Sequence, residues 1–306
     1  VVDTDVSCAS LKFPTGNSAS SSLDINAGTL TVSGTVTIPR AASPAFNIMS
    51  VNGGSLMTSG LAFTNAGTPS AKRHQLIIAN GVVAVSGDVT HSGSTGSATI
   101  AFVGNGRLKV GGEFLTSATA TLTPGEGTIE YDGSRVQTVG SFNYNNLVLS
   151  GLLVKTMTAG TMIAGHLSIA PTGTALAKLV VGQDITAGTL ILGGLVRASG
   201  TWGASDSAAD HKDDNYFAAS TGRLVVTSGS SLTTTVSVWP TATGILYGQA
   251  LLASTLMSGS ASAPGTFSFI DPAAVPDDAG AYEAAVIFTP SDTNLYQTVI
   301  GSVLVN

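Results

Sequence analysis

A short unit recurs nine times between residues 27 and 226 of this 306-residue chain. Each copy opens with Gly or Asn, continues with apolar residues at alternate positions and usually closes on a second Gly. Self-similarity at a period of about 20 to 30 residues is the signature of a solenoid, in which each unit covers the apolar side of the previous one. The leading residues, mostly 19 to 27 positions apart, are Gly28, Gly54, Gly81, Gly106, Gly127, Asn146, Gly165, Gly188 and Gly222.

The apolar residues within a unit lie at positions i and i+2, as in Leu30 and Val32 or Leu108 and Val110. This period predicts strands that bury one face. Gly residues and Asn-Gly pairs between the strands supply the positive φ angles that sharp corners require. We therefore expect an all-β chain whose larger part is a β-solenoid of about nine stacked rungs.

Residues 232–306 have a different composition, with five acidic residues and no Lys or Arg. Short alternating runs, among them 282–288 and 299–305, are separated by turn clusters, a pattern that predicts a small antiparallel sandwich. A Ser/Gly/Thr run at 227–235 marks the boundary, which we expect near residue 231. The expected domains are an N-terminal segment or cap at 1–22, a β-solenoid at 23–231 and a β-sandwich at 232–306.

Two stretches of the solenoid region, GTIEYDGSRVQTVGSFNYNNLVLSG from Gly127 and ASGTWGASDSAADHKDDNYFAASTGRLVV from Ala198, resemble right-handed β-solenoid regions of bacterial surface adhesins and filament proteins. The stretches PTATGILYGQALLASTLMSGSASAPGTFSF and FTPSDTNLYQTVIGSVLVN of the C-terminal region resemble bacterial Ig-like modules that occur in tandem in surface proteins. The resemblance implies a β-solenoid followed by a small Ig-like antiparallel β-sandwich, in an extracellular setting.

Charge and cysteine content limit the classes of binding partner and the cellular compartments that fit this chain. With 12 basic and 18 acidic residues, the net charge is −6, so the chain lacks the basic surface that nucleic acid requires. Gly, Ser and Thr interrupt every apolar run, which argues against a membrane-spanning helix. The single Cys8 forms no internal disulfide, and the opening VVDTDVS looks like a mature N-terminus. We expect a secreted protein at the cell surface.

The N-terminal segment Val1–Ser7 is a candidate for assembly, because Val2, Thr4 and Val6 share one face of an extended strand. One interpretation is that it adds to an exposed sheet edge of the Ig-like module in a neighbouring subunit, which gives a head-to-tail homopolymer. The alternative is a frayed end or the first strand of its own solenoid cap.

Few residues of the chain suggest a catalytic or metal-binding site. Glu130 and Asp132 lie at i and i+2 on an outward face, about 7 Å apart along a strand, a separation compatible with inverting hydrolysis of a polysaccharide. The alternative is that outward solenoid positions are simply polar. The four histidines, His74, His91, His166 and His211, show no zinc-binding spacing and are interpreted as structural or surface residues.

A loop after Trp202 gathers carboxylates that are candidates for Ca²⁺ binding, since this ion prefers oxygen ligands. The loop lacks the regular spacing of an EF-hand, and Lys212 lies inside it, which favours a solvated loop instead. No other cofactor is expected. The candidate ligands are Asp206, Asp210, Asp213 and Asp214.

The sequence therefore predicts a non-enzymatic extracellular structural protein, a subunit of a bacterial surface filament that assembles through β-strand contacts. Two alternatives stay open. One is an adhesin segment that binds a glycan or a protein on a surface, and the other is a β-helical enzyme acting on polysaccharide.

Overall fold

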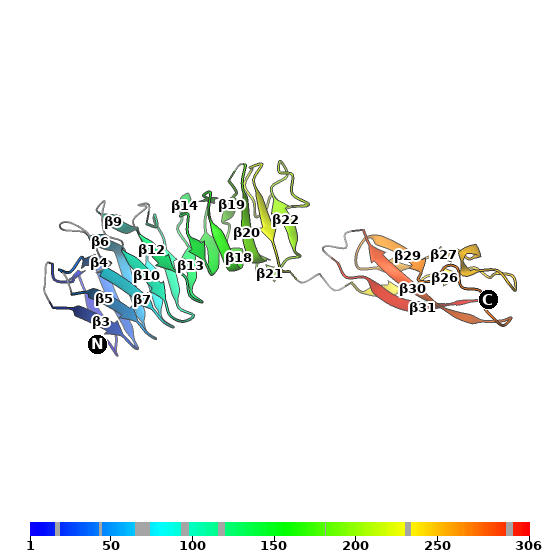
Figure 1. Ribbon diagram of the computed structural model, residues 1–306, viewed down its shortest axis with the longest axis horizontal. Helices are drawn as coiled ribbons and strands as arrows, with labels where there is room; N and C mark the ends of the chain where they lie inside the picture. Colours follow the sequence, from blue (N-terminus) through cyan, green and yellow to red (C-terminus); the bar gives the residue numbers. More distant parts are fainter. Residues whose placement is uncertain are drawn as a thin grey trace. The chain divides into compact units, whose positions relative to one another are not determined.

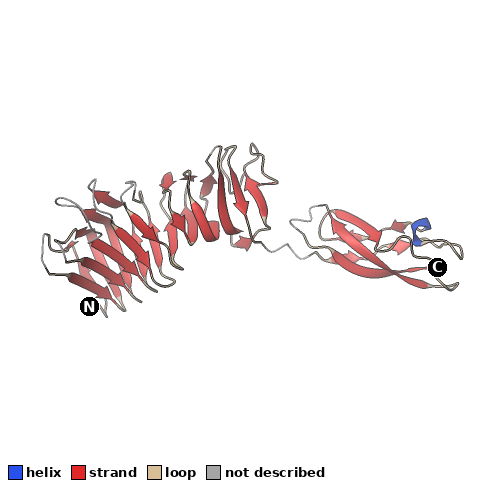
Figure 2. Cartoon of the chain, viewed as in Figure 1, coloured by secondary structure: helices blue, strands red, loops and turns tan. Residues whose placement is uncertain are grey.

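The computed structural model describes residues 1–306 except 16–18, 43–44, 65–73, 93–97, 116–119, 181, 230–233 and 292–295. The described residues form an all-β chain with a single three-residue 3₁₀ turn, Leu251–Ala253 (Figure 2). The chain divides into two compact units, Val1–Val196 with Gly200–Thr227, and Arg197–Ser199 with Ser228–Asn306. The expected boundary at residue 231 lies outside the described residues. In the described part of the chain, no helix has the length and hydrophobicity to cross a membrane.

The first unit is a β-solenoid of about seven turns, built around a long parallel sheet (Figure 1). The predicted solenoid is thereby confirmed. Each turn of the chain adds one strand, hydrogen-bonded in parallel to the strand of the turn before. The strands that succeed one another along this sheet are β4 (Thr29–Pro39), β6 (Ser55–Thr64), β8 (Val82–Val85), β11 (Arg107–Val110), β13 (Thr128–Tyr131), β16 (Asn146–Gly151), β18 (Met162–Gly173) and β20 (Asp184–Leu192).

Equivalent apolar residues of these eight strands stack in one buried column. Each member is a direct register partner of the next, and each has an exposed fraction of 4% or less. The alternation of apolar and polar residues sets this register, because a slip by one residue would turn every buried side chain outward. The column consists of Leu30, Leu56, Val83, Leu108, Ile129, Leu147, Leu167 and Leu190.

The second face of the solenoid changes halfway along. A five-stranded parallel sheet covers the first turns, and a three-stranded parallel sheet covers the later ones. Members of the buried column are 25 to 27 residues apart in the first part and 18 to 23 apart in the second, so the later coils are shorter. The strands are β3 (Ser21–Ile25), β5 (Asn47–Val51), β7 (His74–Ile78), β10 (Thr99–Phe102) and β12 (Thr121–Thr123), then β14 (Gln137–Val139), β17 (Val154–Met157) and β19 (Leu176–Lys178), with β9 (Val89–Ser92) and β15 (Asn143–Tyr144) beside the long sheet.

The ninth repeat does not stack as expected. Leu224 pairs with Ile185 in the first half of β20, whereas Leu190, in the second half, is the last member of the column. The reason is a hairpin at Gly193 and Gly194, both with positive φ, which folds the chain back antiparallel onto the end of β20 and occupies that edge. The strands of this end are β21 (Leu195–Val196), β22 (Gly200–Gly203), β23 (His211–Lys212) and β24 (Arg223–Val226).

The second unit consists of small antiparallel sheets, as the short alternating runs predict. Its largest sheet has the order β29-β30-β31, and its buried core is small, formed by Leu251, Ala284, Val286, Val303 and Val305. This arrangement is compatible with an Ig-like sandwich. The strands are β25 (Val236–Val238), β26 (Thr241–Ala242), β27 (Leu256–Met257), β28 (Ser260–Ala261), β29 (Gly265–Phe269), β30 (Tyr282–Pro290) and β31 (Val299–Val305).

Candidate functional site

Glu130 lies on β13, Asp132 follows directly after this strand, and both carboxylates are bound by cations from the preceding turn. The Glu130 Oε2 atom is 2.9 Å from Nη1 of Arg107, and its Oε1 accepts a 2.6 Å hydrogen bond from Ser150 Oγ. Asp132 Oδ2 is 3.1 Å from Nζ of Lys109, which is also 3.9 Å from Glu130 Oε2. The cluster therefore joins three successive strands, β11, β13 and β16.

This arrangement fits a structural role for the pair better than acid–base chemistry. Glycoside hydrolysis needs one carboxyl group that holds a proton and a second that faces water or the sugar. The Glu130 side chain is only 7% exposed, and its two oxygens face a guanidinium group and a hydroxyl group. Both oxygens are therefore occupied by groups of the chain itself, and neither faces open solvent where a sugar or a water molecule would bind.

The four candidate calcium ligands are directed to different hydrogen-bond donors, three backbone amides and one hydroxyl group, rather than to one centre. Asp206 Oδ1 accepts from the amide of Ser220 at 3.0 Å, and Asp214 Oδ1 accepts from the amide of Ser205 at 2.8 Å. Asp210 accepts from Thr201 Oγ1 at 2.7 Å, and Asp213 accepts from the amide of Asn215. These bonds lower the pKa values of Asp210 and Asp214. Among the described residues, no three His, Cys, Asp or Glu side chains form a group that could hold a metal ion.

The N-terminal segment lies on its own solenoid, the second of the two placements considered from the sequence. Strand β1 (Val6–Cys8) pairs in parallel with β4, and β2 (Leu11–Lys12) pairs further along the same strand. Val2 is buried and forms a bridge to Ile25, whereas Thr4 and Val6 are exposed. The three residues therefore do not share one face, because the chain bends between Val2 and β1.

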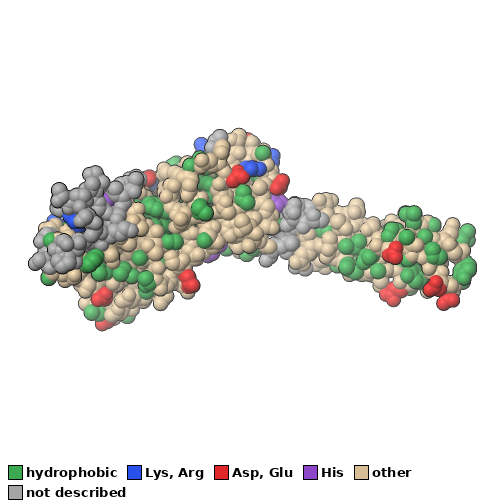
Figure 3. Space-filling model, viewed as in Figure 1, with side chains coloured by type: hydrophobic (Ala, Val, Ile, Leu, Met, Phe, Trp, Pro, Cys, Tyr) green, Lys and Arg blue, Asp and Glu red, His purple; other side chains and the backbone are tan. Residues whose placement is uncertain are grey.

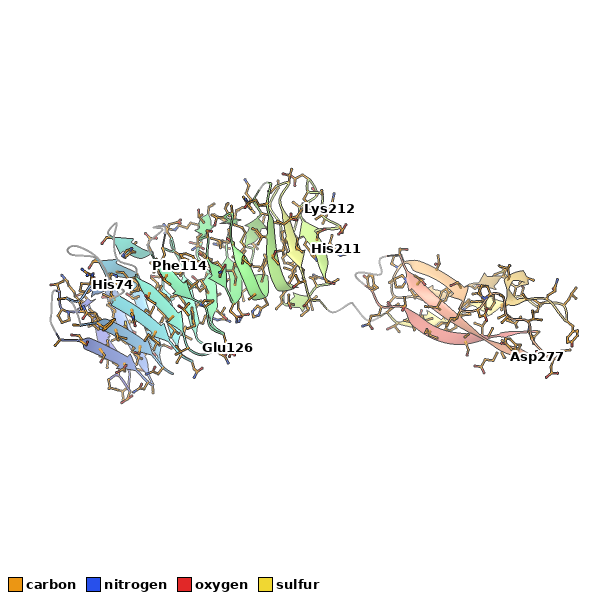
Figure 4. The ribbon with its side chains drawn as sticks, in the orientation of Figure 1. His74, Phe114, Glu126, His211, Lys212 and Asp277 are labelled. Carbon is orange, nitrogen blue, oxygen red and sulfur yellow. The ribbon has the colours of Figure 1, made fainter. Side chains whose placement is uncertain are left out.

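The histidines occupy structural positions in the solenoid. His74 is buried in edge-to-face contact with Phe63 and His91, and burial lowers its pKa to about 4. His211 stacks on Trp202 with ring centroids 4.5 Å apart. Figure 4 shows His211 and its neighbour Lys212 near the C-terminal end of the solenoid, far along the unit from His74.

Buried polar side chains inside the coil were not singled out from the sequence. Lys155 has no exposed surface, and its Nζ donates to the carbonyl oxygens of Gly133 at 2.7 Å and Arg135 at 3.1 Å. Burial lowers its pKa to about 8. Gln137, its register partner one turn earlier, donates from Nε2 to the carbonyl oxygens of Val110 and Gly112. Period-two alternation with buried Met157 was the signal that could have placed Lys155 inside.

Two buried tyrosines form a similar internal contact. The hydroxyl oxygens of Tyr131 and Tyr144 are 3.2 Å apart, and both contact the backbone of Gly140. Burial raises the pKa of Tyr131 to about 12 and that of Tyr144 well above its usual value. Tyr144 is thus part of the core, and its neighbour Phe142 packs against the same core rather than forming an exposed platform.

A groove on the outer face of the long sheet was also missed. It has a volume of about 440 Å³ and follows a bend that recurs in successive turns. At each bend an outward Ser precedes a Gly, and the Gly is required because a Cβ at Gly34 would lie 2.6 Å from the carbonyl oxygen of Ala9. The Ser-Gly pairs are Ser33-Gly34, Ser59-Gly60 and Ser86-Gly87. The Gly of each pair is the one that closes the repeat unit in the sequence.

Comparison of the chain with protein-family models, with curated proteins and with solved structures gives no significant match.

Proposed function

We propose that the chain is a non-enzymatic structural protein of the cell exterior, a subunit of a bacterial surface filament in which copies join head to tail through β-strand contacts. In this proposal the solenoid separates the contact sites along the filament. The second unit is an Ig-like module that forms the strand contact with the next subunit. The observation that carries the proposal is the uncovered edge of the β29-β30-β31 sheet.

Strand β31 is an edge strand among the described residues, since its only sheet partner is β30. It spans seven residues and contains neither a charged residue nor Pro, the devices by which sheets usually block edge pairing. Ile300 is 65% exposed and Leu304 is 62% exposed. A long, uncharged edge with exposed apolar side chains is suited to accept a strand from another chain.

The surface of the second unit supports the same proposal. Figure 3 shows apolar side chains and carboxylates on the visible face of this unit, and residues 228–306 contain no Lys or Arg. Ten large apolar side chains of its described part are exposed. Exposed apolar side chains that lie together on a surface are a feature of protein contact sites. The ten residues are Val238, Leu246, Tyr247, Leu252, Met257, Ile270, Val275, Tyr282, Ile300 and Leu304.

The donor of the added strand is a separate part of the proposal. If Val1–Ser7 is the donor, β1 has to leave β4, and the chain loses the Val6–Cys8 pairing and the burial of Val2. Deletion of residues 1–10 then abolishes polymers while β31 stays intact. Polymers that survive this deletion assign the donor to another strand and leave the acceptor edge as proposed.

The acceptor edge is tested with one charge at a time. We expect Leu304→Lys to lower the mass of assemblies measured by light scattering, because a Lys on an edge strand opposes pairing. Leu252→Lys is the matched control, since Leu252 is 78% exposed in the same unit but lies outside β31. Fibres of unchanged length for both variants in negative-stain microscopy, or chains that are monomeric at every concentration before mutation, would refute the proposal.

A further inference from the structure

The bend groove, the hollow along Ser33, Ser59 and Ser86 on the outer face of the long sheet, has no role in the assembly proposed above. Its floor includes Met57, and Lys109 and Asp132 close one end. Its volume of about 440 Å³ lies within the range of ligand-binding sites. The lining residues come from five turns of the solenoid, so a ligand that fills the groove lies across successive strands.

Hydroxyl groups line the groove at the strand repeat. Ser33, Ser59 and Ser86 are all exposed and recur once per turn, at intervals of about 4.8 Å. The hydroxyls of Ser33 and Ser59 form no hydrogen bond within the described part of the chain. They are therefore available to donate to a ligand and to accept from it.

The charges of the groove balance. Its one cation, Lys109, is 3.1 Å from Asp132 and is also close to Glu130. A phosphate or uronate chain would meet no net positive charge, whereas a neutral ligand finds a donor and an acceptor in the Lys109–Asp132 pair. The lining therefore favours an uncharged ligand.

The backbone under the groove is already paired on both sides. Strand β6 lies between β4 and β8, and β8 lies between β6 and β11. A peptide strand would find no free backbone groups on this face to extend the sheet, whereas a ligand that bonds through its own hydroxyls does not need them. Met57, which is 50% exposed, supplies an apolar surface for the carbon-bound face of such a ligand.

We propose that the bend groove binds a neutral glycan chain, which lies across successive turns and bonds to the serine row. This function is separate from strand-mediated assembly. The groove is the feature of the structure that favours a surface-binding role.

The test is affinity electrophoresis of the full chain in gels that contain a neutral polysaccharide (mannan, xylan, mixed-linkage glucan or starch) or an acidic one (alginate or polygalacturonate). We expect retardation by at least one neutral polymer. Met57→Glu is expected to weaken that retardation at least tenfold, because it places a charge on the floor of the groove. Ser59→Ala removes one hydroxyl and is expected to weaken it about two- to tenfold, in line with the loss of one hydrogen bond.

Two matched substitutions serve as controls. Met162 is 57% exposed elsewhere on the solenoid, and Met257 is 49% exposed in the second unit. Met162→Glu and Met257→Glu are expected to leave retardation unchanged. Thermal unfolding and circular dichroism verify that each variant is folded, and Ser59→Ala carries the test if Met57→Glu does not fold. Migration unaffected by every neutral polymer, stronger retardation by the acidic ones, or equal losses in all three Met→Glu variants would overturn the proposal.

Discussion

The two units of this chain differ in how they cover their apolar side chains. In the solenoid, each row of apolar side chains is covered by the next turn, and one continuous core runs from Val2 to Val226. In the described part of residues 228–306, seven apolar side chains are buried, while ten large apolar side chains are exposed. The basic residues are unevenly divided too, since the second unit contains only Arg197, and the other eleven Lys and Arg residues lie in the first unit or its loops.

Stacking within a chain and association between chains are two ways to cover apolar surface, and the proposed assembly assigns the second way to the second unit. A solenoid turn cannot bury its apolar side alone, so its neighbour in the same chain supplies the cover. The repeat does not continue into residues 232–306, and an exposed apolar edge there is either a contact site or a risk of aggregation. In the solenoid, β1 pairs with the first long strand, β4, and β24 and β21 pair with the last one, β20.

The largest effect is expected from a cavity in the buried column. Leu108 is fully buried between Val83 and Ile129, so Leu108→Ala is expected to cost about 2–5 kcal/mol of unfolding free energy. Calorimetry would show the solenoid transition lowered by roughly 5–15 °C, with the transition of the second unit unchanged.

Leu195→Ala is the matched control for this substitution. Leu195 is 61% exposed in the same unit, and the change is expected to cost less than about 0.5 kcal/mol. Equal losses for the two variants would contradict the view that stacking is the source of stability. A simultaneous shift of both transitions would show that the two units unfold together, and the comparison between them would fail.

A smaller effect is expected from the ion pairs of the buried Glu130. Glu130→Gln keeps the shape of the side chain but removes the charge that faces Arg107 and Lys109. We expect a loss of about 1–3 kcal/mol in denaturant unfolding, because hydrogen bonds to charged groups are among the stronger ones. Glu126→Gln, at an exposed turn of the same coil, is the control and is expected to be near neutral. An unaltered midpoint for Glu130→Gln would assign the pair to another role, and the polysaccharide activity considered from the sequence would then need testing.

Much of this fold follows from patterns in the sequence. Alternation at Leu30 and Val32, or at Leu108 and Val110, places the correct side chains inside, because strand period alone fixes the buried face. The hairpin at Gly193-Gly194 was not predicted, because the sequence pattern there matches that of the other repeats. A corner and a hairpin use the same residue type, and only the pairing of β21 with β20 distinguishes them.

The candidate sites were harder to predict, since they depend on contacts between turns. The sequence places Glu130 and Asp132 on one face, but it does not reveal that Arg107 and Lys109 lie beside them one turn earlier. The bend groove could not be predicted from the sequence for the same reason. Three Ser-Gly pairs separated by more than 20 residues form a row only when the register of the strands is known.

The smallest effect is expected in the pH dependence of stability, and it arises from Lys155. Burial lowers the pKa of this side chain from 10.5 to about 8 in the folded chain. Between pH 8 and pH 10 the unfolded chain holds this proton more tightly, so the folded solenoid becomes more stable as the pH rises. The slope from one group is below about 1.4 kcal/mol per pH unit. Above pH 10 the buried Tyr131 and Tyr144 act in the opposite direction, because their pKa values are raised.

Denaturant unfolding of the solenoid at pH 8, 9 and 10 measures this slope, and Lys155→Met is expected to remove it. Lys178→Met, one turn later on β19 and exposed, is expected to retain it. The second unit is an internal reference, because it contains no Lys. A rise that persists in Lys155→Met would show that another solenoid group titrates in this range. A fall in stability would mean that the carbonyl oxygens of Gly133 and Arg135 hold Lys155 in its charged form despite its burial.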